Sequence, residues 1–221
     1  DRTLYLFKGG KLTAIPVGLG VLTENSIADW RTPTGKFTIV NKRKDPSWRV
    51  PESIQREMEL QGKEVEEMVP PGPDSPLGRY ALDTSIPGVL IHETTKPRSV
   101  YRYLSHGCIR VLPEHMEELY KIIDVKTKGE IIYEPLKIAV SQDEKIYLEA
   151  RTDVYKRVKS LHNEAKKLIE ARGVSNKVDW HKVERLVKEE SGVAEDITLP
   201  TAVAKKASLT QRLLDFLKSP F

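Results

Sequence analysis

The chain has 221 residues, of which 39% are hydrophobic and 31% charged, enough to bury the core of one mid-sized domain or of a domain with an accessory part. Its 36 Lys and Arg exceed its 32 Asp and Glu by a net charge of only +4, with no dense basic stripe of interleaved aromatic residues, which argues against nucleic acid as a partner. No apolar run approaches the roughly 20 residues that span a bilayer, so no transmembrane segment is predicted.

The N-terminal part is rich in strand signals. Two strand-like runs, Thr3–Phe7 and Lys11–Val17, flank Gly9-Gly10, and this pattern predicts a hairpin with a glycine turn. A further strand is predicted over Lys36–Asn41. Proline followed by polar and acidic residues then predicts a short helix over 51–57.

The next segments alternate between loop, strand and helix. Pro70–Gly78 is rich in proline and glycine and is predicted to be a loop. Gly88–His92 is an apolar run of branched residues, which favours a strand that ends at a sheet edge. Proline and acids in the first turn predict a helix over Pro113–Tyr120, and Gly129–Tyr133 returns as a strand. Residues 1–136 are therefore expected to form a β-sandwich or open barrel with one packed helix.

Residues 137–221 differ in character. Apolar residues recur at steps of four and three, which predicts a helix with a stripe for core packing: Val154, Val158, Leu161, Ala165 and Leu168. Further helices are predicted over Asp179–Glu190 and Leu209–Lys218, with a looser connector over Leu199–Lys206. This region is expected to be mainly helical, and the whole chain α+β.

The only cysteine, Cys108, lies in the run Ser105-His106-Gly107-Cys108-Ile109-Arg110. An unpaired cysteine is often an inert, small, buried side chain, but Gly107 gives the backbone freedom to aim this thiol at a ligand. A thiol with a pKa of about 8.5 is mostly protonated at neutral pH, so nucleophilic chemistry requires a base or positive charge beside it. His92 is the candidate base, because the twelve residues between it and Ser105 can return the chain to a neighbouring strand.

This arrangement resembles the signature of the L,D-transpeptidase catalytic domain, a family that remodels bacterial peptidoglycan. Matching stretches cover most of residues 3–135 and include three upstream runs: Arg31–Phe37, Asp45–Trp48 and Val69–Leu82. A short histidine–cysteine pattern alone is a weak signal, whereas this ordered set is a strong one.

The resemblance implies a cysteine acyltransferase that needs no cofactor and no metal. Cys108 would attack the amide between the third residue of a tetrapeptide stem, usually diaminopimelate, and the terminal D-alanine, and form a thioester. His92 would accept the thiol proton and later serve the leaving and attacking amines. The acceptor amine is left open between another stem, a wall-anchored lipoprotein and a free D-amino acid. Carbapenems are implied as covalent inhibitors of Cys108.

Further site residues follow from the same resemblance. The group that orients the base is usually the backbone carbonyl of the next residue, here Glu93, where the family commonly has glycine. A carboxylate beside the site is expected to raise the pKa of both His92 and Cys108. The backbone amides of Gly107 and Cys108 are the expected oxyanion donors. Four residues are expected to contact substrate: Arg110, Tyr80, His106 and Ser105.

Several of these residues have a competing interpretation. Arg110 would serve equally as half of a structural salt bridge, and Tyr80 as a packed aromatic with a hydrogen-bonded hydroxyl. His106 lies two residues from Cys108, so on an extended backbone it would share a face with the thiol and be a rival base. In the family it supports the loop. A zinc site that includes His106 and Cys108 has no Cys-x-x-Cys or His-x-x-x-His pair to support it.

Two other functions stay open. A cysteine hydrolase of peptidoglycan stems or wall-protein linkages would use the same Cys108 and His92 but resolve the thioester with water. The bulky Tyr101-Arg102-Tyr103, where relatives often carry glycine, bears on which nucleophile the pocket admits. A catalytically silent wall-binding module is the second alternative, which intact Cys108, His92 and Gly107 argue against.

Charge and location complete the prediction. Residues 1–136 carry 19 Lys and Arg against 19 Asp and Glu, whereas residues 137–221 carry 17 against 13. The second part is therefore either a basic region that docks on an anionic wall polymer or a solvated helical surface. The resemblance places the protein in the periplasm or cell envelope, as a secreted protein whose signal peptide is absent from this sequence.

Overall fold

The computed structural model describes residues 1–23 and 29–200. They fall into two compact units, Arg2–Tyr133 and Glu134 onward together with Asp1, and each unit has its own hydrophobic core. The boundary expected from the sequence, after residue 136, falls three residues later than this division. Within the described ranges, no helix is long and apolar enough to cross a membrane.

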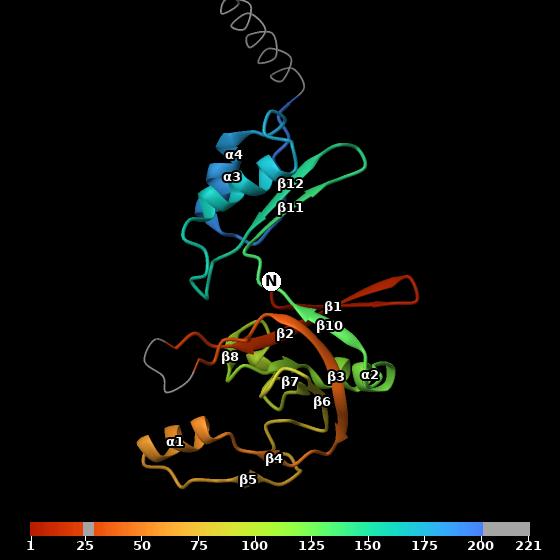
Figure 1. Ribbon diagram of the computed structural model, residues 1–221, viewed down its shortest axis with the longest axis vertical. Coiled ribbons are helices and arrows are strands. Elements are labelled where there is room, and N and C mark those ends of the chain that lie inside the picture. Colours follow the sequence, from red (N-terminus) through yellow and green to blue (C-terminus); the bar gives the residue numbers. More distant parts are fainter. Residues whose placement is uncertain (24–28, 201–221) are drawn as a thin grey trace, which may run out of the picture. The chain divides into compact units, whose positions relative to one another are not determined.

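One open sheet organises the N-terminal unit. Seven strands follow the order β1-β2-β9-β7-β6-β3-β10, and an eighth, β8, pairs with β2 beside this path (Figure 1). The β-rich prediction is confirmed, in the open form rather than as two stacked sheets. The strands are β1 (Thr3–Lys8), β2 (Lys11–Gly20), β3 (Gly35–Lys44), β6 (Tyr80–Thr84), β7 (Leu90–Glu93), β8 (Tyr103–Ser105), β9 (Ile109–Val111) and β10 (Lys128–Ile131).

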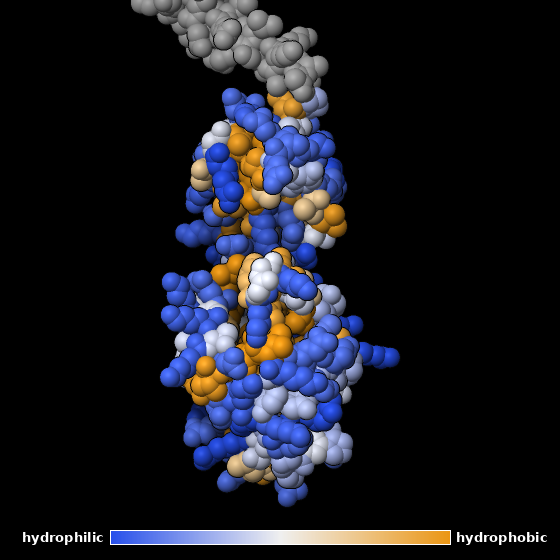
Figure 2. Space-filling model, turned by 90° about the vertical axis from the view of Figure 1, so that its right-hand side faces the viewer, coloured by the Kyte–Doolittle hydropathy of each residue, from blue (hydrophilic) through white to orange (hydrophobic). Residues whose placement is uncertain are grey.

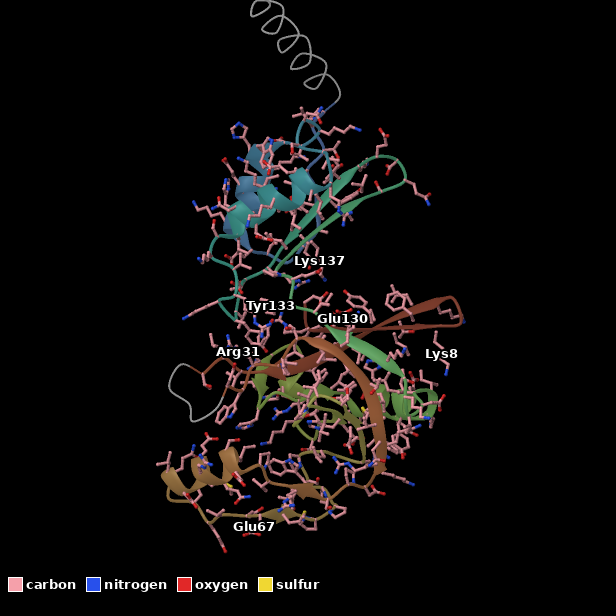
Figure 3. The ribbon with its side chains drawn as sticks, viewed as in Figure 1. Lys8, Arg31, Glu67, Glu130, Tyr133 and Lys137 are labelled. Carbon is pink, nitrogen blue, oxygen red and sulfur yellow. The ribbon has the colours of Figure 1, made fainter. Side chains whose placement is uncertain are left out.

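The predicted β1–β2 hairpin is confirmed. Its turn residues Gly9 and Gly10 have φ values of 57° and 74°, the left-handed conformation that a two-residue hairpin turn requires. Near the turn, Lys8, labelled in Figure 3, donates from Nζ to the carbonyl oxygen of Ile122 at 2.7 Å. The hairpin also exposes three large side chains: Tyr5, Phe7 and Leu12. Figure 2 is viewed from the side toward which the hairpin points and shows hydrophobic surface on the N-terminal unit.

Helix α2 (Pro113–Ile122) covers one face of the sheet. Pro113 starts it with Glu114 in the first turn, and it extends two residues beyond the predicted end. Its buried Met116 and Leu119 join the core with strand residues of the same face: Ile39, Leu82, Ile91, Ile109 and Val111. Because side chains alternate along a strand, the residues between these core positions face away from α2.

An excursion between β3 and β6 carries β4 (Trp48–Arg49), α1 (Glu52–Leu60) and β5 (Met68–Val69), with β4 paired to β5. The predicted short helix is confirmed as α1, and no helix or strand lies within 70–78, as expected for a proline-rich loop. None of the α1 side chains is buried. Figure 1 shows the excursion at the end of the unit opposite β1 and β10.

The C-terminal unit contains a sheet that the sequence analysis missed. Its strands are β11 (Leu136–Val140), β12 (Ile146–Ala150) and β13 (Glu195–Asp196), in the order β11-β12-β13. Helices α3 (Leu161–Ala171) and α4 (Trp180–Glu189) pack with this sheet in one core. The helix predicted over Asp179–Glu190 is confirmed as α4, whose cap Asp179 accepts from the backbone of His181 and Lys182. In the described residues 137–200, two helices are thus paired with a three-stranded sheet.

The helix predicted to begin at Val154 begins at Leu161 instead. The Asp153 carboxylate accepts the backbone N–H groups of Arg157 (3.1 Å) and Val158 (2.6 Å), which closes a turn before the helix. Ser160 then caps α3 by accepting from Asn163. The helix expected over 209–218 and the connector from residue 201 onward lie outside the described residues.

Most of the net positive charge of residues 137–221 lies in residues 201–221, outside the described residues. Residues 137–200 carry 13 Lys and Arg against 12 Asp and Glu, whereas residues 201–221 carry 4 against 1. The folded C-terminal unit is therefore close to neutral, and its net charge favours a solvated surface over an electrostatic dock.

Because the two cores share no residue, we expect a chain that ends at Tyr133 to keep the sheet unit folded. Circular dichroism during heating measures this: the shortened chain is expected to unfold in one cooperative transition. Cys108 in it should react with a small thiol reagent at the rate of the full chain. A shortened chain without a cooperative transition would show that residues 134–221 stabilise the sheet.

Candidate active site

The pairing of β7 with β9 brings the predicted catalytic residues together. The two strands are parallel, with Ile91 opposite Ile109 and His92 opposite Arg110. Ile91 and Ile109 point into the core beneath α2, so His92, Arg110 and Cys108, one residue before β9, lie on the other face. The positive charge of Arg110 lowers the pKa of both His92 and Cys108, as expected of neighbours. The twelve-residue spacer thus returns the chain to the adjacent strand.

His92 is buried and held in one tautomer. Its Nδ1 lies 2.7 Å from the carbonyl oxygen of Glu93. Since a carbonyl oxygen only accepts, Nδ1 carries the proton and Nε2 has the free lone pair. Burial, together with the positive charges of Arg110 and Arg43, lowers the pKa of His92 to about 4, although the hydrogen bond to Glu93 acts to raise it. The imidazole is therefore neutral at pH 7 and can accept a proton.

Cys108 is a protonated thiol at rest. Its Sγ donates to the carbonyl oxygen of Gly88 at 3.5 Å. Burial raises the pKa of this thiol, while a backbone hydrogen bond from Leu90 and the positive charges of Arg110 and Arg43 oppose the rise. A neutral thiol thus shares a face with a neutral imidazole, and the nucleophile forms when a base removes the proton.

The Glu93 side chain does not act on the site as expected. It pairs in register with Val111, so it points to the α2 face, away from His92. There its Oε2 lies 3.7 Å from Nε of Arg79. The Glu93 carboxylate is not among the charges that shift the pKa of His92 or Cys108. The expectation that it raises both pKa values is wrong: burial lowers that of His92 and raises that of Cys108.

Ser105 and Gly107 build the turn that presents the thiol. Ser105 is 1% exposed, and its hydroxyl donates to the Cys108 carbonyl oxygen at 2.6 Å and accepts from the Gly107 N–H at 3.3 Å. Gly107 has a φ of 107°, which glycine adopts readily. Ser105 is therefore a buried organiser of the turn rather than a surface for substrate. The Gly107 amide, expected as an oxyanion donor, is already occupied by Ser105.

His106 points elsewhere than Cys108. The positive φ of Gly107 interrupts the extended backbone on which the two side chains were expected to share a face. His106 Nε2 lies 3.4 Å from Glu57 Oε2 on α1, and its ring stands edge-on to Trp30 at a centroid distance of 4.0 Å. This supports the loop-supporting interpretation and not the rival base. Over residues 1–23 and 29–200, no three His, Cys, Asp or Glu are grouped to hold a metal ion.

Tyr80 also faces away from the thiol. Its neighbour Ala81 lies opposite His92, so Tyr80 points to the α2 side. There its ring packs against Tyr120 of α2 at a centroid distance of 4.6 Å. The expected pocket-lining role is replaced by that of a packed aromatic residue.

Arg43 and Asp83 belong to the site and were missed by the sequence analysis. Arg43 lies opposite Ala81, and Asp83 opposite Leu90, which places both on the face of His92. Nη2 of Arg43 is 2.8 Å from Oδ1 of Asp83, and both charges act on the pKa of Cys108. The β6 run that contains Asp83 was not predicted as a strand. Its two adjacent buried residues, Ala81 and Leu82, break the alternation that marks a strand, so the run carried no clear signal.

Arg110 has a half-buried guanidinium beside Cys108. Among the described residues, the Arg110 guanidinium forms neither a hydrogen bond nor an ion pair. The structural salt bridge considered from the sequence is therefore not present there. Burial lowers the pKa of Arg110, and the nearby Cys108 sulfur partly opposes this. A positive group without a counterion in this place is suited to bind an anion.

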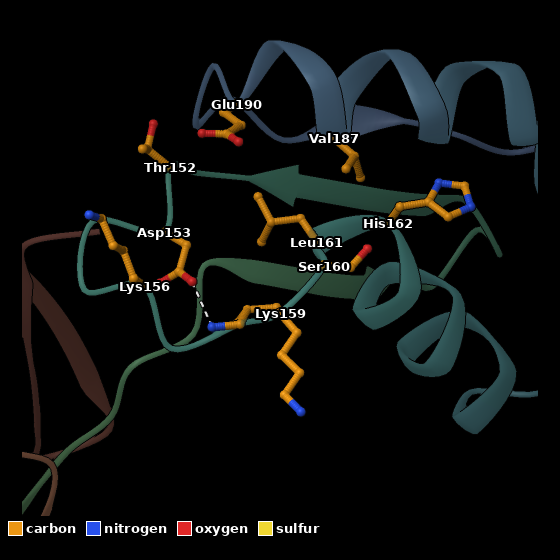
Figure 4. Close-up of a pocket in the computed structure, with 10 residues that line it drawn as sticks. Thr152, Asp153, Lys156, Lys159, Ser160, Leu161, His162, Val187 and Glu190 are labelled. Atoms are coloured by element: carbon orange, nitrogen blue, oxygen red, sulfur yellow. Dashed lines mark hydrogen bonds between the residues drawn. The ribbon is translucent and has the colours of Figure 1, made fainter.

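A separate cavity of about 420 Å³ lies in the C-terminal unit, between the loop after β12 and the start of α3 (Figure 4). It contains none of the predicted site residues. The Asp153 carboxylate in its wall is engaged by the backbone N–H of Val158, so this acid closes a turn.

Comparison with known proteins defines the class of protein. Residues 1–131 match the model of the YkuD family, the L,D-transpeptidase catalytic domain. The chain belongs to this family.

Curated relatives carry the same family name. The probable L,D-transpeptidase YbiS of Escherichia coli K12 is 31% identical over 153 residues, which cover 67% of this chain and 47% of that protein. The probable L,D-transpeptidase ErfK/SrfK of Salmonella typhimurium is 32% identical over 154 residues, 67% of this chain and 47% of that protein. The chain thus spans about half the length of these relatives.

Solved structures of the family show a more distant likeness. The L,D-transpeptidase of Enterococcus faecium is 22% identical, with a TM-score of 0.43 over 60% of this chain and 46% of that one. The protein from Mycobacterium smegmatis is 22% identical, with a TM-score of 0.42 over 60% and 54%. The family assignment rests on the sequence matches.

Proposed function

We propose that this protein is a cysteine acyltransferase of peptidoglycan, in which Cys108 is the nucleophile and His92 the base. One observation carries the proposal: the parallel register of β7 and β9 places His92, Cys108 and Arg110 on one face, with His92 held in the tautomer that can accept a proton. The acyl donor is a tetrapeptide stem, and the bond broken is the amide between diaminopimelate and D-alanine.

The reaction proceeds in two transfers. Nε2 of His92 takes the proton of the Cys108 thiol as sulfur attacks the amide carbonyl carbon. The carbon–nitrogen bond then breaks, and His92 returns the proton to the departing amine of D-alanine, which leaves a thioester. An acceptor amine attacks the thioester, His92 removes a proton from that amine, and the thiol is restored with that proton. No external oxidant or cofactor enters this balance.

The oxyanion of each tetrahedral intermediate needs a donor near the sulfur. The backbone amide of Cys108 is the proposed one. The N–H of Gly107 donates to the Ser105 hydroxyl in this structure. It can act as a second oxyanion donor only if this hydrogen bond breaks. The positive charges of Arg110 and Arg43 further stabilise negative charge on the sulfur.

Arg110 is proposed to bind a carboxylate of the stem, since its guanidinium lacks a counterion in the described chain. We expect Arg110→Gln to raise the KM for a tetrapeptide stem by about tenfold or more, in line with the loss of a charge-assisted hydrogen bond. The rate at which iodoacetamide, which has no carboxylate, labels Cys108 is expected to change far less. Equal losses toward both reagents would show that Arg110 serves the thiol and not the substrate.

β-Lactams, and carbapenems among them, are proposed as covalent inhibitors of Cys108. Their strained carbonyl presents the thiol with an amide-like target, and ring opening leaves the acyl group on sulfur. The E. faecium catalytic domain was solved acylated by ertapenem. For this chain, the intact mass should rise by one drug equivalent, on Cys108 alone.

Mass spectrometry of muropeptides after incubation with the purified protein tests the function. New cross-links between stems, with release of D-alanine, are the expected result. Tripeptide stems without cross-links would show that water resolves the thioester, which is the hydrolase alternative. Attachment of a wall-anchored lipoprotein would identify a protein lysine as the acceptor. The cell envelope is the proposed location, since peptidoglycan is there.

A further inference from the structure

Glu93 combines two features that lie on opposite sides of the sheet. Its backbone carbonyl oxygen accepts the Nδ1 proton of His92 on the active face, at 2.7 Å. Its side chain points to the α2 face and is only 8% exposed. One residue thus connects the catalytic imidazole to the packing beneath it.

The side chain of Glu93 is confined by its neighbours. Gly78 has a φ of 62°, and a Cβ at that position would lie 2.6 Å from Cβ of Glu93 and 2.7 Å from its Cγ. The absence of a side chain at residue 78 therefore makes the space that Glu93 occupies. Arg79, the next residue, lies 3.7 Å from the Glu93 carboxylate and 3.6 Å from that of Glu117 on α2.

This arrangement lowers the stability of the fold, so packing alone does not explain it. Oε2 of Glu93 is buried without a hydrogen bond, because its nearest cation lies beyond hydrogen-bond distance and is itself 56% exposed. A buried carboxylate with incomplete pairing costs stability, and an apolar side chain of similar size would fill the same space at lower cost. The polar end of Glu93 therefore points to a role in positioning, through its contact with Arg79.

The group that is positioned is the peptide group between Glu93 and Thr94. Because a peptide group is planar, the carbonyl of Glu93 and the N–H of Thr94 move as one unit. The Thr94 N–H donates to the carbonyl oxygen of Val111 at 2.9 Å, and the Glu93 carbonyl accepts from His92. Holding the Glu93 side chain restricts the backbone rotation that turns this plane.

We propose that Glu93 is a positioning residue, whose side chain, held by Gly78 and Arg79, fixes the carbonyl that orients His92. This rests on the proposed role of His92 as the base. Glu93 touches neither substrate nor the reacting sulfur, and it acts only through the direction of its own carbonyl. The direction of the Glu93 carbonyl, which orients His92, is thereby determined by contacts on the opposite face of the sheet.

Three variants test the proposal, with two measurements on each. Glu93→Ala removes the side chain, Arg79→Gln removes the cation that pairs with it, and Glu93→Gln keeps its shape and an oxygen that can accept from Arg79. Nitrogen NMR of His92 measures the fraction of the Nδ1–H tautomer without any substrate. The rate of Cys108 acylation by a carbapenem measures the consequence for chemistry.

We expect Glu93→Ala and Arg79→Gln to populate both tautomers of His92 and to slow acylation by about tenfold, as misplacement of a catalytic group does. Glu93→Gln should stay within about threefold of the natural protein, because its amide keeps the space and the contact. Glu117→Gln is the matched control, since it removes the other carboxylate near Arg79 and leaves Glu93 in place. It is expected to change neither measurement.

A purely structural Glu93 would give a different result. Variants that lose thermal stability but keep the Nδ1–H tautomer and the acylation rate in the folded protein would overturn the proposal. If Glu93→Ala does not fold, Arg79→Gln decides alone. If the natural protein itself resists acylation while the tautomer still responds to these variants, the proposed function fails and the positioning role stands.

Discussion

Cys108→Ala is expected to abolish acylation by a carbapenem and turnover of peptidoglycan stems. The sulfur is the atom on which the acyl group is carried, and no other cysteine in the chain can replace it. The free energy of unfolding is expected to change by less than about 1 kcal/mol, because the substitution removes only the sulfur atom, with its long contact to Gly88 and its hydrogen bond from the Leu90 backbone. Intact-protein mass spectrometry and thermal unfolding measure the two effects.

The matched control is Ser47→Ala, which removes one γ atom from an exposed position of the excursion. It should leave both measurements unchanged. Retained transfer in Cys108→Ala would eliminate the thiol mechanism, and a large loss of stability would mean that the thiol is primarily a packing element.

His92→Ala is expected to slow Cys108 acylation by about a hundredfold or more, the usual cost of losing a general base. The pH profile should also change. With a base of pKa about 4 facing a thiol of raised pKa, the natural protein should react at a nearly constant rate from pH 5.5 to 8 and slow as pH falls toward 4. In His92→Ala only preformed thiolate reacts, so the rate should rise about tenfold per pH unit over the same range.

Folding stability provides an independent check of the same pKa. The pKa of His92 falls from its unfolded value near 6.5 to about 4 on folding, so between these values the unfolded chain binds more protons. His92 should therefore lower the stability of the natural protein as pH falls from 6.5 to 4. In His92→Ala this part of the decline should be missing.

His106→Ala serves as the control histidine, because its ring contacts Glu57 and Trp30 instead of the thiol. Its effect on acylation is expected to be mild. A severe loss in His106→Ala together with a mild one in His92→Ala would reverse the assignment of the base.

The elements that could be predicted are those whose signals are local. Gly9-Gly10 requires a left-handed turn, Pro113 with Glu114 starts a helix, and Asp179 caps one, so each was located within a few residues. The three-stranded sheet of the C-terminal unit was not predicted. β12 alternates between buried and half-buried residues, but over only five residues, which is a short signal. The helix-like spacing that follows from Val154 favoured a helical interpretation of the whole region.

The sequence by itself determined the family and the candidate pair of His92 and Cys108, because the order and spacing of chemically distinctive residues are written along the chain. Only the tertiary structure decided which side chains share a face. In a strand, a shift of one residue reverses the direction of every side chain, and the register of β7 with β9 and β6 depends on pairing between distant segments. That register sends Tyr80 and the Glu93 carboxylate to the α2 side and gathers Arg43, Asp83 and Arg110 around the thiol. The positive φ of Gly107 likewise turns His106 toward α1, an outcome of backbone geometry that spacing alone does not encode.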